Sequence, residues 1–397
     1  MIKNLNNNFF SDRALFNLGF RPFFLGALTF SIITVALWMA IFAFNVQLYL
    51  QPLSGYQWHA HEMIFGYSFA VIAGFLLTAV QNWTGMQTLH GLPLLILFSL
   101  WIIARVMFLF GTSFISIAAI FDLLFALVLT GATATPVIVT QNWRQLGIIF
   151  KVLLIVLANV IFYLGVQGFI LQGIYLGIYL GFYLVISLIM MLGSRVVPFF
   201  IERGVGYPVT LYNPKWLAIA SMVLFICFII VEIFIHNTTV SGCLAAGLFI
   251  ITTVRLFGWY TKGIWINPLL WGLYISFVFI AAGFLLFALG AFAGVSNFLA
   301  IHSLAYGGIG IVTVSMMARV SLGHTGRDIH HPPGTVFFAL LLLILGTISR
   351  VGLPLVDMQH YVAWVVVSQV FWIIAFLLIV ITYAPILSSP RIDGKPG

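Results

Sequence analysis

Apolar segments long enough to cross a lipid bilayer follow one another along almost the whole chain. A spanning helix needs about 20 consecutive, mostly apolar residues, and only short connections separate these segments. Of the 397 residues, 63% are hydrophobic and 6% are charged, whereas a soluble domain has roughly 25% charged residues. There is too little polar surface to cover a water-soluble globule. The chain is therefore expected to fold as helices that cross a membrane many times.

The hydropathy pattern predicts an all-α membrane protein in which residues 1–397 form a single polytopic transmembrane domain. Pro136 is expected to kink or end the fourth span, and pseudo-repeated four-helix units are a further hypothesis. With boundaries good to about 2–4 residues, twelve transmembrane helices are expected at 21–45, 61–80, 92–110, 113–139, 145–165, 169–193, 214–235, 239–258, 268–291, 297–320, 334–352 and 360–386.

The lysine and arginine residues fall almost entirely on one side of these predicted spans. Cytoplasmic loops of membrane proteins are enriched in these residues. With the N-terminus in the cytoplasm, all but Arg105 and Arg350 of the 16 basic residues lie on the inner side. This asymmetry predicts that both termini are cytoplasmic. The basic residues form no cluster or basic helix face, so the net charge of +8 does not indicate a nucleic acid partner.

Two spans each begin with a histidine and have the same length. His61 lies 24 positions before Gly85, and His302 lies 24 positions before Gly326. Both histidines fall near the outer face in the predicted topology. Imidazole is the commonest metal ligand, and helix bundles build cofactor sites from facing helices. The shared register predicts that His61 and His302 are the two axial ligands of a haem, with a plain helix-capping role as the alternative for each.

Further polar residues surround this predicted site. His59 is two positions from His61, so the two rings point to nearly opposite sides of a regular helix. Glu62 suits the first turn of a helix, or accepts a hydrogen bond from a ligating imidazole or binds a second metal. His324, near the inner face, is either a proton entry point or, as we favour, a polar loop cap.

The two outer arginines have two interpretations. Arg105 is expected to pair with Asp122, and Arg350 with Asp357, because an unpaired charge at membrane depth is costly. Alternatively, both arginines bind haem propionates, which need cations on the same side as His61. A guanidinium has five N–H donors, so one arginine can do both. No phosphate-binding loop or hydrolase motif occurs.

Several motifs are spread from the first span to the tenth: Leu18–Phe24 (LGFRPFF), Trp58–Met63 (WHAHEM), Gly74–Ala79 (GFLLTA), Asn82–Gly85 (NWTG), Gly193–Phe199 (GSRVVPF) and Arg319–Arg327 (RVSLGHTGR). Together they resemble the NnrS family of bacterial inner-membrane proteins. The resemblance implies a haem- and copper-containing protein made in response to nitric oxide, which lessens nitrosative damage and accompanies denitrification. The family motif includes His59, His61, Glu62, His302 and His324.

A weaker resemblance is to subunit I of haem-copper oxidases and nitric oxide reductases, where histidines of helices two and ten hold a low-spin haem. Carried over by position, those residues are again His61 and His302. The sixth predicted span has no histidine, the seventh has none inside it, and the tenth has no His-x-His. A catalytic haem–copper pair would lack ligands, so reduction chemistry of that type is not expected. Copper would need another site, for which His59, Glu62 and His360 are the candidates.

Together, these features predict a protein of the bacterial inner membrane that protects against nitric oxide, by binding it or by electron transfer at a b-type haem. Its expected partners are the lipid bilayer, nitric oxide as ligand, and a quinol or another electron donor. Whether it is an enzyme stays open; if so, it is an oxidoreductase acting on nitric oxide or a related nitrogen species. The alternatives are a transporter of a metal, a nitrosyl-iron complex or a small anion, and a non-catalytic sensor or assembly factor for denitrification.

Overall fold

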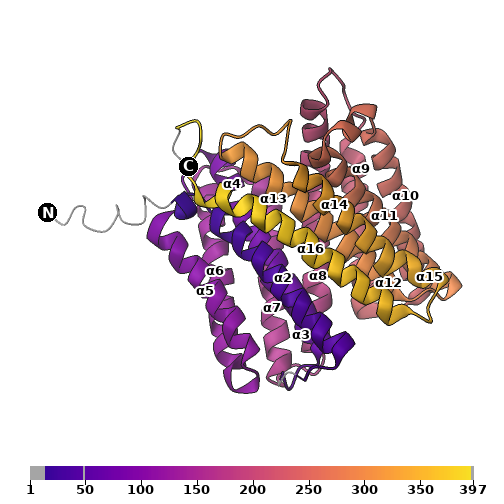
Figure 1. Ribbon diagram of the computed structural model, residues 1–397. Coiled ribbons are helices and arrows are strands. Elements are labelled where there is room, and N and C mark those ends of the chain that lie inside the picture. The colour runs from indigo at the N-terminus through magenta and orange to yellow at the C-terminus, as the bar shows by residue number, and fades with distance from the viewer. Residues whose placement is uncertain (1–13, 48–49, 395–397) are drawn as a thin grey trace. The chain divides into compact units, whose positions relative to one another are not determined.

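A computed structural model describes residues 14–47 and 50–394, and all the regular structure in these residues is helical (Figure 1). Twelve helical segments of the described chain are long and apolar enough to cross a membrane. The predicted fold class, an all-α membrane protein with twelve transmembrane helices, is confirmed. The candidate spans are Phe20–Phe44 (α2), Gly55–Thr84, Gly91–Leu109 (α5), Ile115–Val139 (α6), Trp143–Val166, Gly173–Gly204 (α8), Lys215–Ile235, Thr238–Trp259 (α10), Pro268–Ala293 (α11), Asn297–His324, Gly334–Val356 and Tyr361–Ser388 (α16).

Five of these spans contain shorter elements in addition to a regular α-helix. The span Trp143–Val166 begins with a single 3₁₀ turn, and each of the other four contains a π-helical segment. The α-helices of these five spans are α3 (Gly55–His61) and α4 (Phe69–Thr84), α7 (Leu146–Val166), α9 (Lys215–Ile230), α12 (Asn297–His302) and α13 (Ile311–His324), and α14 (Gly334–Thr347) and α15 (Leu353–Val356).

The largest differences from the predicted boundaries have local causes. The second span begins at Gly55, six residues before the predicted start at 61, because Ser54 caps it. The Ser54 hydroxyl accepts from the backbone N–H of Gln57, and the Gln57 side chain accepts from the Ser54 N–H, which satisfies two otherwise unpaired donors. The sixth span continues through Pro198 to Gly204 instead of ending at 193. Pro136, which was expected to kink or end the fourth span, lies inside α6, and the helix continues to Val139.

The direction of the spans through the membrane, with both termini inside, stays a prediction. Part of the charge argument for it comes from Lys3, Arg13 and Lys395, which lie outside the described residues. The four-helix repeat also stays a prediction.

The chain divides into two compact units. Unit 1 comprises Met1–Val185, Val320–Arg327 and Val380–Gly397, and unit 2 comprises Ile186–Arg319 and Asp328–Ile379. The helices α8, α13 and α16 each contribute residues to both units. His61 belongs to unit 1 and His302 to unit 2, so the surroundings of each histidine are described separately.

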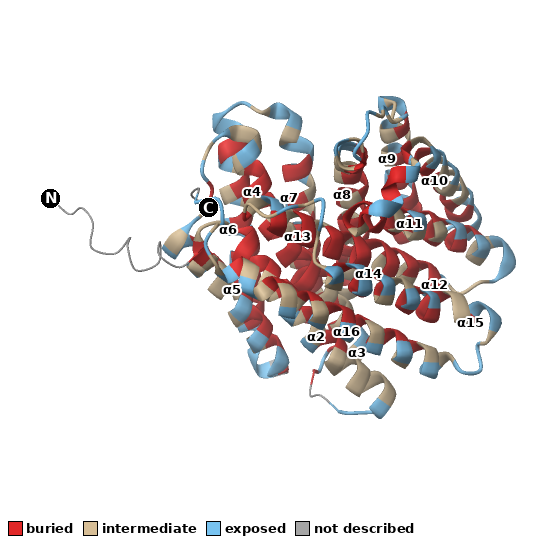
Figure 2. Ribbon diagram, turned by 45° about the horizontal axis from the view of Figure 1, so that its top comes forward, coloured by how far each residue is buried: buried red, intermediate tan, exposed pale blue. Residues whose placement is uncertain are grey.

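The two histidine-bearing spans are the most enclosed of the twelve candidates. Over an 18-residue apolar stretch within each span, the share of buried residues is 83% in Gly55–Thr84 and 78% in Asn297–His324, and it is 56% or less in the others. Figure 2 shows the nearly continuous burial along α4 and α13, whereas α5 and α10 each mix buried, intermediate and exposed residues. Spans enclosed by other helices can hold polar groups away from lipid, which favours them as the location of a functional site.

The same break in helical geometry follows each of the two histidines. α3 ends at His61 and gives way to a π-helical segment, Glu62–Ser68. α12 ends at His302 and gives way to another, Ser303–Gly310. π-helical segments are rare and occur frequently at functional sites. The shared register predicted from the sequence therefore corresponds to a shared local structure.

Close packing in unit 2 generates a first prediction. A Cβ atom added to Gly346 would lie 2.0 Å from the hydroxyl oxygen of Tyr306, which donates a hydrogen bond to the carbonyl of Ser368. Gly346→Ala should lower the free energy of unfolding in detergent by about 1–3 kcal/mol, the usual cost of overpacking. The matched control is Gly131→Ala, since nothing lies within 4 Å of that added Cβ. Equal stability of both variants would contradict the packing described.

Candidate functional site: buried charges around His61

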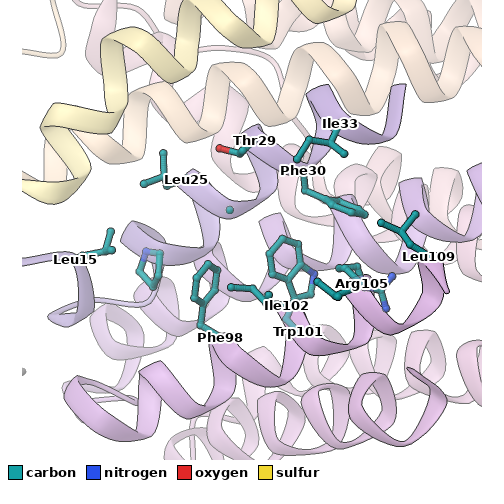
Figure 3. Close-up of a pocket in the computed structure, with 13 residues that line it drawn as sticks. Leu15, Leu25, Thr29, Phe30, Ile33, Phe98, Trp101, Ile102, Arg105 and Leu109 are labelled. Atoms are coloured by element: carbon teal, nitrogen blue, oxygen red, sulfur yellow. The ribbon is translucent and has the colours of Figure 1, made fainter. Parts of the chain in front are cut away.

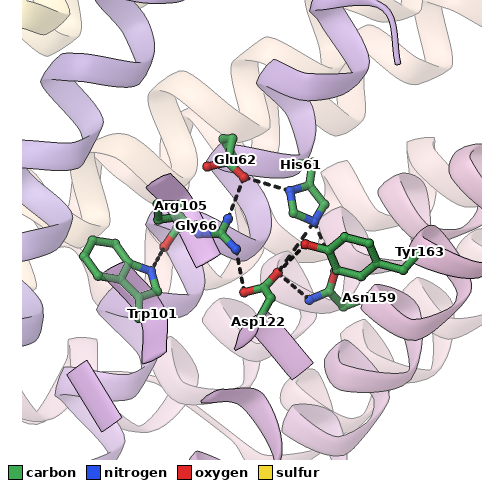
Figure 4. A network of polar contacts seen from close by, with 8 residues as sticks. All are labelled: His61, Glu62, Gly66, Trp101, Arg105, Asp122, Asn159 and Tyr163. Carbon is green, nitrogen blue, oxygen red and sulfur yellow. Dashed lines mark hydrogen bonds and ion pairs between the residues drawn. The ribbon is translucent and has the colours of Figure 1, made fainter. Parts of the chain in front are cut away.

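Four ionisable side chains of unit 1 meet inside the helices, at the junction of α3 and the π-helical segment (Figure 4). Their exposed fractions are 0% for His61, 1% for Glu62, 3% for Arg105 and 0% for Asp122. Charges at membrane depth are stable only when other groups compensate them. The contacts of this cluster therefore decide what it can do.

Arg105 joins the two carboxylates of the cluster. Its Nη1 lies 2.5 Å from Oε1 of Glu62, and its Nη2 lies 2.5 Å from Oδ1 of Asp122. The predicted pair of Arg105 and Asp122 is confirmed, and Glu62 is a second partner. Arg105 is on α5, Asp122 on α6 and Glu62 in the second span, so one guanidinium ties three helices together.

His61 faces an acceptor oxygen at each ring nitrogen. Its Nδ1 lies 2.9 Å from Oε1 of Glu62, and its Nε2 lies 3.1 Å from Oδ1 of Asn159. The orientation of the Asn159 amide follows from its other contact, because its Nδ2 donates to Oδ2 of Asp122 at 3.0 Å. Both contacts of the imidazole are hydrogen bonds when both of its nitrogens carry a proton. Two positive and two negative groups then give a buried network with no net charge.

Two members of this network, Asn159 and Tyr163 on α7, were not predicted from the sequence. The Tyr163 hydroxyl donates to Oδ2 of Asp122 at 3.0 Å. A signal was present: Asn159 is a polar residue inside an apolar span, and Tyr163, four positions later, lies on the same helix face. The sequence alone could not indicate which carboxylate they contact.

Aromatic rings enclose the imidazole of His61. The ring centroids of Phe108 and Phe162 lie 4.6 Å and 4.3 Å from the centroid of the His61 ring, and both rings stack on it. Phe65 and Tyr163 also contact the ring. This packing keeps water from the ion pairs, and electrostatic interactions are stronger where water is absent.

The π-helical segment shapes the other side of the network. The carbonyl of Gly66 accepts a hydrogen bond from Nε1 of Trp101 at 3.0 Å. A Cβ on Gly66 would lie 2.7 Å from the ring of Phe30 and 3.0 Å from Nη1 of Arg105. Glycine at this position therefore allows the guanidinium to reach Glu62.

An apolar groove of about 350 Å³ runs along α2 and α5 beside the network (Figure 3). Phe30, Phe98 and Trp101 form aromatic parts of its wall, and the only polar residues that line it are Thr29 and Arg105. The charged end of Arg105 is directed to its two carboxylates. The lining suits hydrocarbon, and no ligand is assigned to this groove.

His302, the counterpart of His61 in unit 2, has different partners. Its Nδ1 donates to the carbonyl of Phe298 at 2.7 Å, and its Nε2 lies 3.1 Å from Nη2 of Arg350. The Nη1 of Arg350 donates to the hydroxyl of Tyr361 at 2.9 Å. The predicted pair of Arg350 and Asp357 is wrong.

Asp357 pairs instead with His360 at the start of the last span. The Nδ1 of His360 lies 2.8 Å from Oδ2 of Asp357. The hydrogen bond from the His360 side chain lowers the pKa of Asp357 below its ordinary value. Because Asp357 and His360 are only three positions apart, their side chains pair locally, whereas Arg350 is further away along the chain.

The candidate copper ligands do not form one group in the described part of the chain. His59 stacks on Trp38, with ring centroids 4.9 Å apart, on the side away from His61, as the helical spacing predicted. Glu62 is used by His61 and Arg105. Among the described residues, no group of three or more His, Cys, Asp or Glu side chains could hold a metal ion. A copper site at His59, Glu62 and His360 stays a prediction.

The inner motif around His324 receives the C-terminal segment of unit 1. The carbonyl of His324 accepts from Nη1 of Arg391, and the carbonyl of Thr325 accepts from the N–H of Ile392. Gly326 has a φ of +76°, and a Cβ there would lie 2.8 Å from Cγ of Asp393. These contacts favour the loop-cap interpretation of this motif over proton entry.

An all-helical chain of twelve candidate spans, with a compensated charge network enclosed among them, is a multi-pass integral membrane protein. A profile of the NnrS protein family matches residues 14–391. The protein belongs to this family, as its motifs predicted. No curated protein matches the chain.

The charge network generates a second prediction. Asp122→Asn removes the negative charge and one of two acceptor oxygens, so the side chain can no longer both face Arg105 and accept from Asn159 and Tyr163. Because breaking a buried ion pair leaves an uncompensated charge, the free energy of unfolding should fall by about 3–5 kcal/mol. Asp357→Asn is the matched control: its carboxylate pairs with His360 near the surface, where ion pairs contribute little. Thermal unfolding in detergent measures both, and an unchanged Asp122→Asn variant would contradict the network.

Proposed function

We propose that this protein acts in the bacterial inner membrane to protect the cell against nitric oxide, by binding it or by electron transfer at a b-type haem. Membership of the NnrS family over residues 14–391 supports the nitric oxide role. The observation that carries the haem part is the hydrogen bonding of His302. When bound, the haem would supply the iron that binds nitric oxide or passes an electron.

His302 fits the role of an iron ligand. Its Nδ1–H is fixed by the carbonyl of Phe298, so the lone pair is on Nε2. Metal-binding histidines characteristically donate the other ring N–H to a carbonyl or carboxylate, which fixes the tautomer and the ring orientation. In the described conformation, Nε2 accepts from Arg350, and an iron bound there would replace that N–H.

His61 does not fit that role in the described conformation. Both of its ring nitrogens face acceptor oxygens, and aromatic rings pack against the imidazole. A metal at Nε2 would have to replace Asn159. Since His61 and His302 belong to different units, a haem held jointly by both stays a prediction, and no chemical step is derived through it.

The network around His61 supports a positioning role instead. Its four charged groups compensate one another and hold the second, third, fourth and fifth spans in fixed register. Such a fixed charge distribution would keep its orientation while a nearby cofactor changes charge. Copper, which the family resemblance implies, has no three-ligand group among the described residues, and we assign no role to it.

The proposal predicts that the purified protein is coloured and that its Soret band depends on His302. His302→Ala should lower haem content by about tenfold or more, because even indirect loss of ligand support weakens metal binding 10–100-fold. His330→Ala, in an exposed connection, is the matched control and should keep the wild-type spectrum. Nitric oxide should shift the Soret band of wild type.

The outcomes separate the remaining interpretations. A wild-type Soret band in His302→Ala would sink the ligand assignment. Loss of the band in His61→Ala, with the fold intact, would favour the joint ligation predicted from the sequence. A colourless, metal-free wild type would contradict the haem and favour transport.

A further inference from the structure

We propose that Arg350 and Tyr361, beside His302, form a binding site in unit 2 for a planar, singly charged oxyanion such as nitrite or a carboxylate. This site goes beyond the proposed function, because it follows from the charged groups that surround the two histidines. It comes from comparing the surroundings of the two histidines, each within its own unit.

The two surroundings share a local design. Each histidine is the last residue of a short α-helix and is followed directly by a π-helical segment. In each unit, an arginine of the following span reaches back to that junction: Arg105 to Glu62, and Arg350 to His302. A side chain of the next span then completes the contacts of each guanidinium, Asp122 in unit 1 and Tyr361 in unit 2.

The two surroundings differ in their carboxylates. The position after His61 is Glu62, whereas the position after His302 is Ser303, whose hydroxyl donates to the carbonyl of Phe279. In place of Asp122, unit 2 offers the neutral phenol of Tyr361. Both negative charges that compensate the guanidinium in unit 1 are therefore replaced by neutral groups in unit 2.

This replacement leaves Arg350 without a carboxylate partner among the described residues. Only 8% of its surface is exposed. The acids of unit 2 have other partners: Glu202 accepts from the Leu211 N–H, Glu232 from Ser241, Asp328 from His331, and Asp357 from His360. A buried cation without a counter-ion is costly. An anion from outside the chain would lower that cost.

Two other buried arginines of unit 2 show why Arg350 is distinctive. The guanidinium of Arg255 lies 4.7 Å from the ring centroid of Trp259, and that of Arg319 lies 4.0 Å from that of Phe200. Each of these guanidinium groups faces an aromatic ring, and Nη1 of Arg255 also donates to the Ser221 hydroxyl. Arg350 also lies over a ring, at 5.2 Å from Tyr361, but here a phenol O–H and an imidazole converge on it.

The geometry indicates the shape of the anion. In unit 1, carboxylate oxygens lie 2.5 Å from both terminal nitrogens of Arg105. Among the described residues, the equivalent nitrogens of Arg350 contact the Tyr361 oxygen and the His302 ring, and neither contacts a carboxylate. The planar fork of a guanidinium matches planar oxyanions, which accept two parallel hydrogen bonds. His302 and Tyr361 are both partly exposed, so a small anion can reach the site.

The test is a calorimetric titration of the purified full-length protein with sodium nitrite at fixed chloride concentration. Arg350→Gln should weaken nitrite binding by about tenfold or more, because charged hydrogen bonds are lost. The matched control, Arg144→Gln, changes an exposed arginine in the 3₁₀ turn that begins the fifth span and should bind like wild type. Tyr361→Glu would place a carboxylate beside Arg350, and should abolish nitrite binding while raising the unfolding temperature.

The same variants distinguish two sources of the oxyanion. Nitrite binding that depends on Arg350, including in haem-free protein, supports a free anion. If the protein does not bind nitrite, and Arg350→Gln loses haem whereas Arg144→Gln keeps it, the oxyanion is a carboxylate of the bound cofactor. If Arg350→Gln changes neither nitrite binding nor haem content, the site is overturned. That result would leave the His302 spectrum untouched, so it is separable from failure of the proposed function.

Discussion

The bridge from Arg105 to Glu62 and Asp122 is the interaction on which the structure around His61 depends. Without both carboxylates, a guanidinium that is 3% exposed would carry an uncompensated charge among apolar helices. The bridge also fixes the carboxylate oxygens that hold the His61 ring and, through Asn159, its second nitrogen. Because buried ion pairs contribute little net stability, we interpret the network as a device that specifies helix register and imidazole orientation.

Unit 2 uses the same local design with the opposite balance of charge. Its histidine also precedes a π-helical segment, and its arginine also reaches that junction, but Ser303 and Tyr361 stand where unit 1 has acids. Unit 1 is therefore self-compensating, whereas the guanidinium of unit 2 contacts only neutral groups among the described residues and, in our proposal, binds an external anion. This difference fits our proposal that His61 has a positioning role in the charge network, whereas His302 is the iron ligand. It also agrees with the tautomer of His302: because Nδ1–H donates to the Phe298 carbonyl, the lone pair is on Nε2.

Much of the fold followed from the sequence, because lipid imposes a uniform requirement on every span. The twelve apolar segments, the shared register of His61 and His302, and the pair of Arg105 with Asp122 were all predictable. The full network around His61 was less predictable. Many polar and aromatic residues lie in the spans, and only the packing of the helices determines that Asn159 and Tyr163 contact Asp122. Asp357 was assigned to Arg350 on charge alone, but a histidine three positions away competes more effectively. The π-helical segments have no sequence signature that we recognise.

The central claim is that His61 is held with both ring nitrogens donating, to Glu62 and to Asn159. It is tested most directly by ¹⁵N nuclear magnetic resonance of protein labelled at its histidine rings. The signals of His61 are those lost in His61→Gln. The account predicts two N–H signals for this ring in the wild-type protein. A single N–H signal paired with a bare or metal-bound ring nitrogen would contradict it, and would return His61 to the role of a ligand.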